Sequence, residues 1–180
     1  MTTQVVDWVQ SKGALPYYYH LNPFTETFLQ PEFRILSDNE SIEVKQYLQF
    51  DRKIVEKLEM CHSVWQFHLI NNLESTHLIN DLNAKNSLEK LKQPITIYLT
   101  YPFTKVVELK LNPIIRKWKN GKTESFFSVG YIFWQVANVY ASLYKNHWEE
   151  IGIKEHGLSD LYFEDCFIDS NGKASLFIGS

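Results

Sequence analysis

The clearest pattern in the sequence is the alternation of apolar and polar residues over 95–101 and again over 107–111. A period of two residues is typical of a β-strand with one buried face. The segment 101–105 would connect the two strands, and Asn112-Pro113 would end the second. We therefore predict two consecutive strands in the middle of the chain.

Turn signals predict further strand pairs. Asn120-Gly121 is the strongest short hairpin signal of the chain. A strand-like pattern over 31–50 contains the turn residues Asp38-Asn39, which predicts a hairpin there. The end of the chain, 158–178, alternates in the same way around a turn at 169–172, so we expect a terminal hairpin.

The best helix prediction covers residues 129–148. Ser125 or Ser128 can cap its first turn, and Gly152 would stop it. Apolar residues at helical spacing form one stripe, with Gln135 among the polar residues of the opposite side. The stripe consists of Val129, Ile132, Phe133, Val136, Tyr140, Leu143 and Tyr144.

Strands, one long helix and strands again predict an α+β fold, with an antiparallel or mixed sheet and the helix packed on one face. A chain of 180 residues fits a single domain over 1–180. Within it, residues 1–30 carry an aromatic-rich run between Pro16 and Pro23, which predicts an irregular arm. We expect that arm to pack on its own domain, with ordering by a partner as the alternative.

Composition excludes disordered, collagen-like and fibrous classes, because 44% of the residues are apolar and only 22% are charged. The formal net charge is −3, with the positive charge concentrated in residues 85–122. That basic middle makes the fold electrostatically self-complementary or presents a positive face to an acidic partner. We favour the first interpretation.

From the sequence we expect the protein to be located in the cytoplasm. The first residues lack the basic and apolar regions of a secretory signal, and no window is apolar enough to span a membrane. Cys61 and Cys166 are then expected to be reduced, buried thiols.

Candidate ligand or metal residues gather after the predicted helix. His147, Glu150, His156 and Asp160 supply imidazole nitrogens and carboxylate oxygens. If they lined a cleft, the protein would be a small enzyme or a ligand-binding protein. A solvated acidic loop is the simpler interpretation of the same residues.

No short catalytic motif accompanies these residues. The sequence has no Gly-x-Ser-x-Gly elbow, no P-loop and no Gly-x-Gly-x-x-Gly. The group Cys61, His62, His68 and His77 lacks the ligand spacing of a zinc site. We therefore assign no catalytic residues, metal or cofactor, and lean towards a protein that is not an enzyme.

A basic patch surrounds the predicted turn at 120–121. Its residues are Arg116, Lys117, Lys119 and Lys122. Lysines there could contact phosphates while Trp118 stacks on a base. Because the sequence pI is only about 6.1 and lysines also protect exposed strand edges, nucleic acid is not the favoured partner.

Aromatic residues at irregular places favour a protein-interaction module. The candidates are Tyr17, Tyr18, Tyr19, Phe24, Trp118 and Trp148. Trp134 and Trp148 lie beside the helical stripe and are expected to be partly exposed. Aromatic side chains bury large areas at little rotamer cost and commonly anchor interfaces. We expect a protein partner, with a homo-oligomer favoured and no membrane contact.

Overall fold

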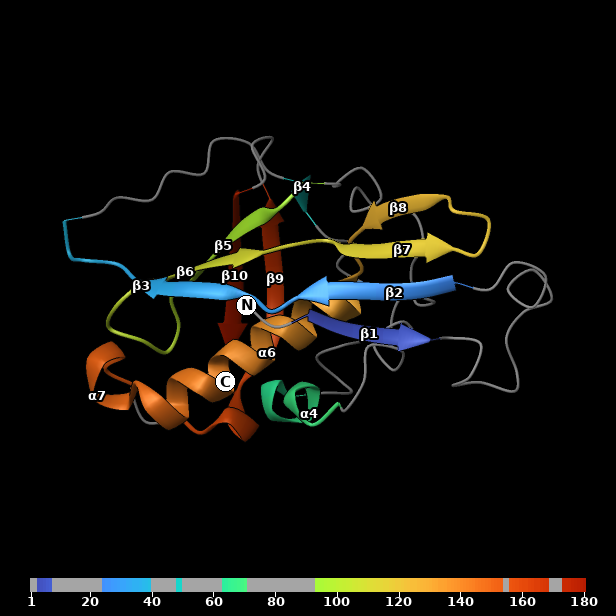
Figure 1. Cartoon of the computed structure of the whole chain (residues 1–180). Coiled ribbons are helices and arrows are strands. Elements are labelled where there is room, and N and C mark those ends of the chain that lie inside the picture. The colour runs from blue at the N-terminus through green and yellow to red at the C-terminus, as the bar shows by residue number, and fades with distance from the viewer. Residues whose placement is uncertain are drawn as a thin grey trace.

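The computed structural model describes residues 3–7, 24–39, 48–49, 63–70, 93–153, 156–168 and 173–180, which form two sheets and several helices (Figure 1). The strands are β1 Thr3–Asp7, β2 Phe24–Leu29, β3 Glu32–Ile35, β4 Leu48–Gln49, β5 Ile95–Leu99, β6 Val107–Leu111, β7 Ile114–Trp118, β8 Thr123–Phe126, β9 Tyr162–Ile168 and β10 Lys173–Gly179. The helices are α4 Val64–His68, α6 Val129–Asn146, α7 Trp148–Ile151 and the short 3-10 helix η2 Leu158–Asp160.

The strands divide into two sheets of different character. Four strands form an antiparallel sheet in the order β1-β2-β7-β8, and six form a mixed sheet in the order β3-β6-β5-β10-β9-β4. Strands β10 and β5 are parallel, whereas β9 and β10 form the antiparallel C-terminal hairpin. The α+β class, the long helix and the terminal hairpin are therefore confirmed.

One antiparallel ribbon runs through both sheets. The pairing of β2 with β7 places Thr27 opposite Ile115, and the pairing of β3 with β6 continues the same register without an inserted residue. Pro31 lies between β2 and β3, and Pro113 lies between β6 and β7. Because proline has no backbone N–H to donate, the ladder is interrupted there and the ribbon passes from one sheet to the other.

Local signals placed two strand pairs correctly. Strands β5 and β6 pair antiparallel across the connection at 101–105. Strands β7 and β8 pair across the turn at Asn120-Gly121, where Gly121 has φ +89°. A positive φ strains most L-residues but not glycine, which explains the strength of this signal.

Other strand predictions need correction. The predicted hairpin about Asp38-Asn39 is wrong in its described part, because β3 pairs with β6 while Leu48–Gln49 pairs with β9 at the opposite edge of the sheet. Residues 40–47 lie outside the described ranges. Within the predicted arm over 1–30, β1 and β2 are paired strands. Strand β2 was not predicted because Glu26, a charged residue, occupies one of its buried positions and interrupts the apolar alternation that marks a strand.

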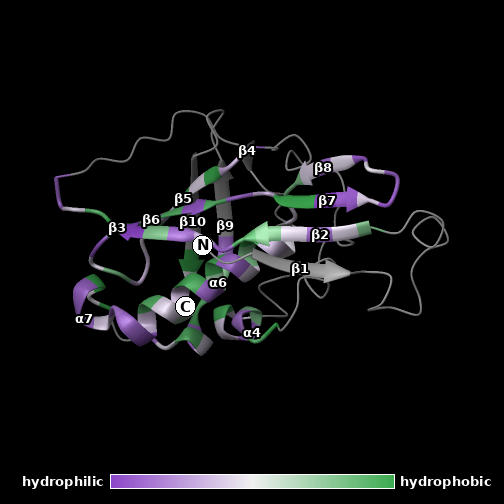
Figure 2. Cartoon of the chain, viewed as in Figure 1, coloured by the Kyte–Doolittle hydropathy of each residue, from purple (hydrophilic) through white to green (hydrophobic). Residues whose placement is uncertain are grey.

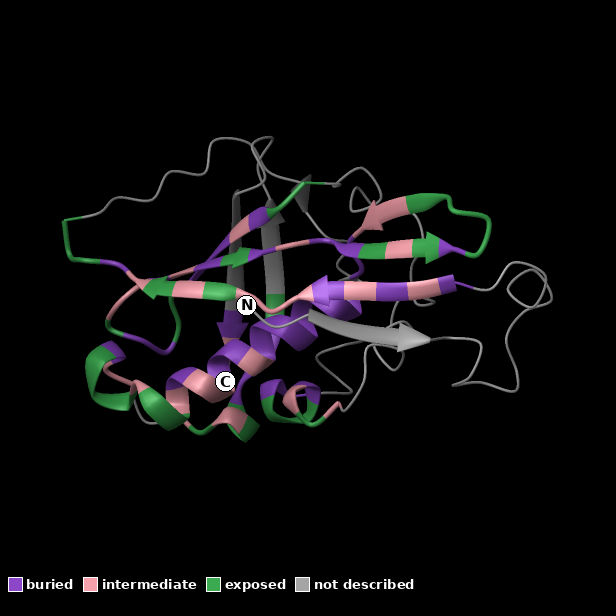
Figure 3. Cartoon of the chain, in the orientation of Figure 1, coloured by how far each residue is buried: buried purple, intermediate pink, exposed green. Residues whose placement is uncertain are grey.

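Helix α6 begins as predicted and is buried more widely than predicted. The Ser128 hydroxyl accepts a hydrogen bond from the Tyr131 N–H at 3.1 Å, which satisfies one of the free donors of the first turn. Gln135 was expected on the polar side of the helix and Trp134 was expected to be partly exposed, but they are 0% and 5% exposed. Figure 3 shows that burial extends over most of the first half of α6. None of the described helices is long and apolar enough to cross a membrane.

The helix is buried on several sides because it packs against both sheets. The Phe133 ring stacks on Phe163 of β9 with the ring centroids 4.3 Å apart. The rings of Tyr131 and Trp134 meet Phe28 of β2 edge-on at 5.7 and 5.5 Å. The same helix therefore holds the six-stranded and the four-stranded sheet in one hydrophobic core.

The predicted helix end at residue 148 is slightly too late. Helix α6 ends at Asn146, and the short helix α7 follows after His147. Gly152 then stops α7 with φ +62°, as the sequence predicted. A Cβ at this glycine would overlap the side chain of Thr104, so both the backbone and the packing require glycine.

Tyrosine hydroxyls and a tryptophan N–H on α6 donate hydrogen bonds to backbone carbonyl groups of the connecting segments. Such carbonyls lie outside helices and ladders and need a partner when water is excluded. The bonds run from the Tyr131 hydroxyl to the Asn112 oxygen (3.0 Å), from the Tyr140 hydroxyl to the Tyr101 oxygen (2.6 Å), from the Tyr144 hydroxyl to the His156 oxygen (2.8 Å) and from the Trp134 indole N–H to the Ile70 oxygen (3.0 Å). The helix thus fixes the loops as well as the core.

The Tyr131 bond at the ribbon break yields a test of stability. Replacing Tyr131 by Phe removes the donor of the Asn112 carbonyl and should lower the free energy of unfolding by about 1.5 kcal/mol. The matched control is Tyr101→Phe, which removes an exposed hydroxyl contact with Ser180 and should cost less than about 0.5 kcal/mol. Urea denaturation of both variants measures the difference, and equal losses would contradict this role for Tyr131.

The buried tyrosines of α6 predict a loss of stability at alkaline pH. Burial raises the pKa of Tyr131 and Tyr140, and burial together with the charges of Tyr101 and Asp160 raises the pKa of Tyr144 to about 12. These hydroxyls lose their protons near the ordinary value of 10.0 only in the unfolded chain, so stability should fall as the pH rises from 10 towards 12. Tyrosinate absorbance and circular dichroism, followed together, should show these hydroxyls ionising only on unfolding; their ionisation in the folded protein would contradict the prediction.

Candidate functional site

The predicted cluster after α6 separates into two sets of contacts. His147 Nδ1 lies 3.0 Å from Glu150 Oε2, and the His147 ring meets Phe33 of β3 edge-on at 5.5 Å. These contacts link α7 to the edge of the six-stranded sheet. This half of the predicted site is therefore a pair of side chains one helical turn apart, and Glu150 is exposed.

The other two residues contact different parts of the chain. The Asp160 carboxylate accepts a hydrogen bond from the Gly157 N–H at 3.1 Å, which closes the turn before β9. The His156 ring lies 5.9 Å from the ring of Tyr101, and its Nε2 is 3.4 Å from the Ser180 hydroxyl. Among the described residues, no three His, Cys, Asp or Glu side chains are placed to hold a metal ion.

The basic patch also divides, because Arg116 belongs to the interior. Its guanidinium donates to Glu26 Oε1 from Nε at 2.8 Å and from Nη2 at 2.6 Å, and to Glu124 Oε1 at 3.2 Å. The Glu26 side chain is 0% exposed and that of Arg116 16%. The guanidinium also lies over the rings of Phe24 and Phe126. Arg116 is thus part of a structural ion pair rather than of a surface patch.

Trp118 is also buried, contrary to the predicted role in stacking on a base. It is 6% exposed, and Phe24 meets its ring edge-on at 4.8 Å. The exposed lysines around the turn are Lys117, Lys119 and Lys122. Figure 2 shows this tip and α7 as hydrophilic parts at opposite ends of the view. Lysines at the tip remain compatible with anion contact, but Trp118 offers them no stacking surface.

The exposed aromatic positions are only partly those predicted. Trp148 is 53% exposed as expected, whereas Tyr17, Tyr18 and Tyr19 lie outside the described residues. The sequence patterns missed α4, which exposes Trp65 and is followed by the exposed C-cap residue Leu69. The sequence does contain a signal for the start of this helix, a serine followed three residues later by a glutamine. Ser63 and Gln66 form a capping box, in which the Ser63 N–H donates to Gln66 Oε1 at 2.7 Å and the Gln66 N–H donates to Ser63 Oγ at 3.3 Å.

The group of cysteine and histidine residues that lacked zinc-site spacing lies mostly outside the described residues. Cys61, His62 and His77 lie outside the described residues, and only the backbone is described at Cys166 in β9. His68 is described, and its Nδ1 lies 3.0 Å from Asn138 Oδ1 on α6. Its role in the structure is therefore to attach α4 to α6.

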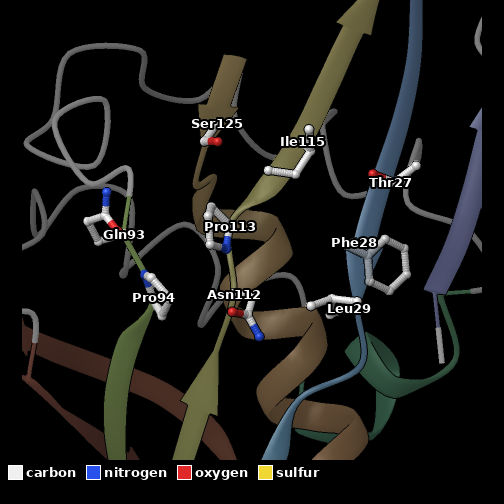
Figure 4. A pocket seen from close by; sticks show the side chains of 9 residues that line it. All are labelled: Thr27, Phe28, Leu29, Gln93, Pro94, Asn112, Pro113, Ile115 and Ser125. Atoms are coloured by element: carbon white, nitrogen blue, oxygen red, sulfur yellow. The ribbon is translucent and has the colours of Figure 1, made fainter. Parts of the chain in front are cut away.

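A cavity at the junction of the two sheets was not predicted. It has a volume of about 520 Å³ and lies beside the break in the ribbon (Figure 4). We call it the junction cavity. The residues that line it are Thr27, Phe28, Leu29, Gln93, Pro94, Asn112, Pro113, Ile115 and Ser125. These residues come from β2, β7, β8 and the segments next to β5 and β6, and the strand pairing brings these distant parts of the chain together.

Comparison of the chain with protein-family models, with curated proteins and with solved structures finds no match.

The buried ion pair yields a prediction for the four-stranded sheet. Glu26→Gln should lower the free energy of unfolding by about 3 kcal/mol, because it leaves the Arg116 guanidinium without its buried counter-charge. Glu124→Gln is the matched control, since the Glu124 side chain is 37% exposed and its bond is longer; we expect a loss below about 1 kcal/mol. Chemical denaturation measures both, and a Glu26 variant no less stable than the control would refute the buried pair.

Proposed function

We propose that this chain is a non-enzymatic, cytoplasmic protein-interaction module that self-associates through an exposed apolar surface on α4. We call this surface the α4 face and define it as Trp65 and Leu69. The observation that carries the proposal is their exposure of 41% and 54%. Residues four positions apart lie side by side on a helix, so the two side chains form one continuous apolar area.

The α4 face is held in place before any partner arrives. The Trp65 ring lies 5.5 Å from the ring of His68, and His68 is bonded to Asn138 of α6. The capping box at Ser63 fixes the start of the helix. Binding through a side chain that is already ordered loses less conformational entropy, and tryptophan is enriched among the residues that dominate interface energies.

The charge around the face favours a second copy of the chain as its partner. In a two-fold symmetric contact each residue of the patch meets the same patch of the other copy. Residues 63–70 contain no Asp, Glu, Lys or Arg, so the α4 face itself would not oppose two like charges in such a contact. Trp148 differs, because Glu149 and Glu150 follow it directly and a symmetric contact there would oppose two acidic groups.

The proposal predicts a self-association that depends on the α4 face. The double variant Trp65→Ser, Leu69→Ser should raise the dimer dissociation constant at least about tenfold, since it removes the apolar area without touching the core. Trp148→Ser is the matched control because it removes another exposed tryptophan, which is 53% exposed against 41% for Trp65. Sedimentation velocity over a range of concentrations measures the effect, with circular dichroism confirming the fold.

Two outcomes would contradict the proposal. One is a wild-type chain that stays monomeric over the whole concentration range. The other is a dimer that the double variant leaves intact, or that Trp148→Ser weakens as much. Acrylamide quenching gives an independent check, because self-association should protect Trp65 from the quencher and leave Trp148 accessible.

A further inference from the structure

We propose that the junction cavity binds a neutral small molecule with a flat apolar body and an amide-like edge. This site is separate from the α4 face and does not depend on the proposed self-association. The cavity lies on the outer face of the four-stranded sheet, where that sheet meets the start of β5 and the end of β6 (Figure 4).

The register of three strands builds the floor of the cavity. Thr27 of β2 lies opposite Ile115 of β7, and Ile115 lies opposite Ser125 of β8. Side chains at directly opposed positions lie on the same face of a sheet, so an apolar side chain stands between two hydroxyl groups. Ile115 is 39% exposed, which leaves apolar surface for a ligand to cover.

The walls combine rigid apolar rings with carboxamides. Pro94 and Pro113 supply the rings, while Gln93 and Asn112 supply groups that both donate and accept hydrogen bonds. The main chain at Asn112 is held in place, since its backbone carbonyl oxygen accepts a hydrogen bond from the Tyr131 hydroxyl at 3.0 Å. A ligand with a neighbouring donor and acceptor could bond to a carboxamide while its flat body covers Ile115.

The lining also selects the charge of the ligand. Its polar members are hydroxyls and carboxamides, and none of the lining residues carries an ionisable side chain. An ion in this partly open cavity would lose some of its hydration without meeting an opposite charge among the lining residues, which favours a neutral molecule over an ion. A neutral molecule loses less hydration and can replace its water contacts with the four polar side chains.

Size and position fit a ligand rather than a packing defect. A volume of about 520 Å³ lies within the roughly 300–1,000 Å³ typical of small-molecule sites. Phe28 lines the cavity and also packs edge-on against Tyr131 and Trp134 of α6, so the cavity borders a well-packed part of the core. The cavity therefore has room for a two-ring molecule.

The test compares three probes of nearly the same shape: naphthalene carboxamide, naphthalene carboxylate and the aminomethyl naphthalene cation. Saturation-transfer NMR and amide chemical-shift titration measure their affinities for the full chain. We expect the carboxamide to bind at least about tenfold more tightly than either ion, with shifts concentrated around Thr27, Ile115 and Ser125.

Two variants locate the binding and control for folding. Ile115→Glu places a carboxylate on the floor and should weaken carboxamide binding at least about tenfold. The same change should strengthen binding of the cation, a gain that an unfolded protein would not show. Thr123→Glu is the matched control, because Thr123 is exposed, pairs with Lys117 outside the cavity and receives the same charge; it should leave the carboxamide affinity within about twofold.

The proposal is overturned if the carboxamide does not bind, if the ions bind equally well, or if the chemical shifts cluster away from the floor of the cavity. It is also overturned if Ile115→Glu and Thr123→Glu have the same effect on all three probes. Failure of self-association would leave these results unchanged, since no residue of the α4 face lines the cavity.

Discussion

The break in one antiparallel register is the constraint on which the rest of this structure depends. If β2 and β3 had continued as a single strand against β6 and β7, the ribbon would have stayed in one sheet. Pro31, between β2 and β3, and Pro113, between β6 and β7, remove backbone donors from both sides of the ribbon near the same point. The ribbon divides there, and the molecule acquires a second sheet, a junction and a cavity beside it.

A divided ribbon needs something to hold its halves together, and α6 does so. Its aromatic side chains pack on Phe28 of one sheet and on Phe163 of the other, so neither sheet is covered alone. Its tyrosine hydroxyls also bond to carbonyls that no ladder satisfies, including that of Asn112 at the break itself. Hydrophobic packing and hydrogen bonding thus converge on a single helix.

The sequence was informative where the determining signal is local. The turn at Asn120-Gly121 and the alternation over 95–111 need only a few adjacent residues, and both predictions were confirmed. It failed where burial depends on distant partners. Arg116 resembled a surface cation because Glu26 lies 90 positions away, and Gln135 resembled an exposed residue because the second sheet was not foreseen. The cavity has no local signal, since its lining meets only through strand register.

The same alternation that buries the ion pair creates the floor of the cavity. Glu26 and Arg116 point to the inner face of the four-stranded sheet, and their immediate neighbours Thr27 and Ile115 therefore point to the outer face. The inner pair fixes how β2 and β7 lie together, which sets the distance between the hydroxyl and the isoleucine outside. The stabilising ion pair and the proposed ligand site thus lie on opposite faces of the same two strands. The α4 face is anchored separately, through His68 and α6, so the two proposed surfaces can act independently.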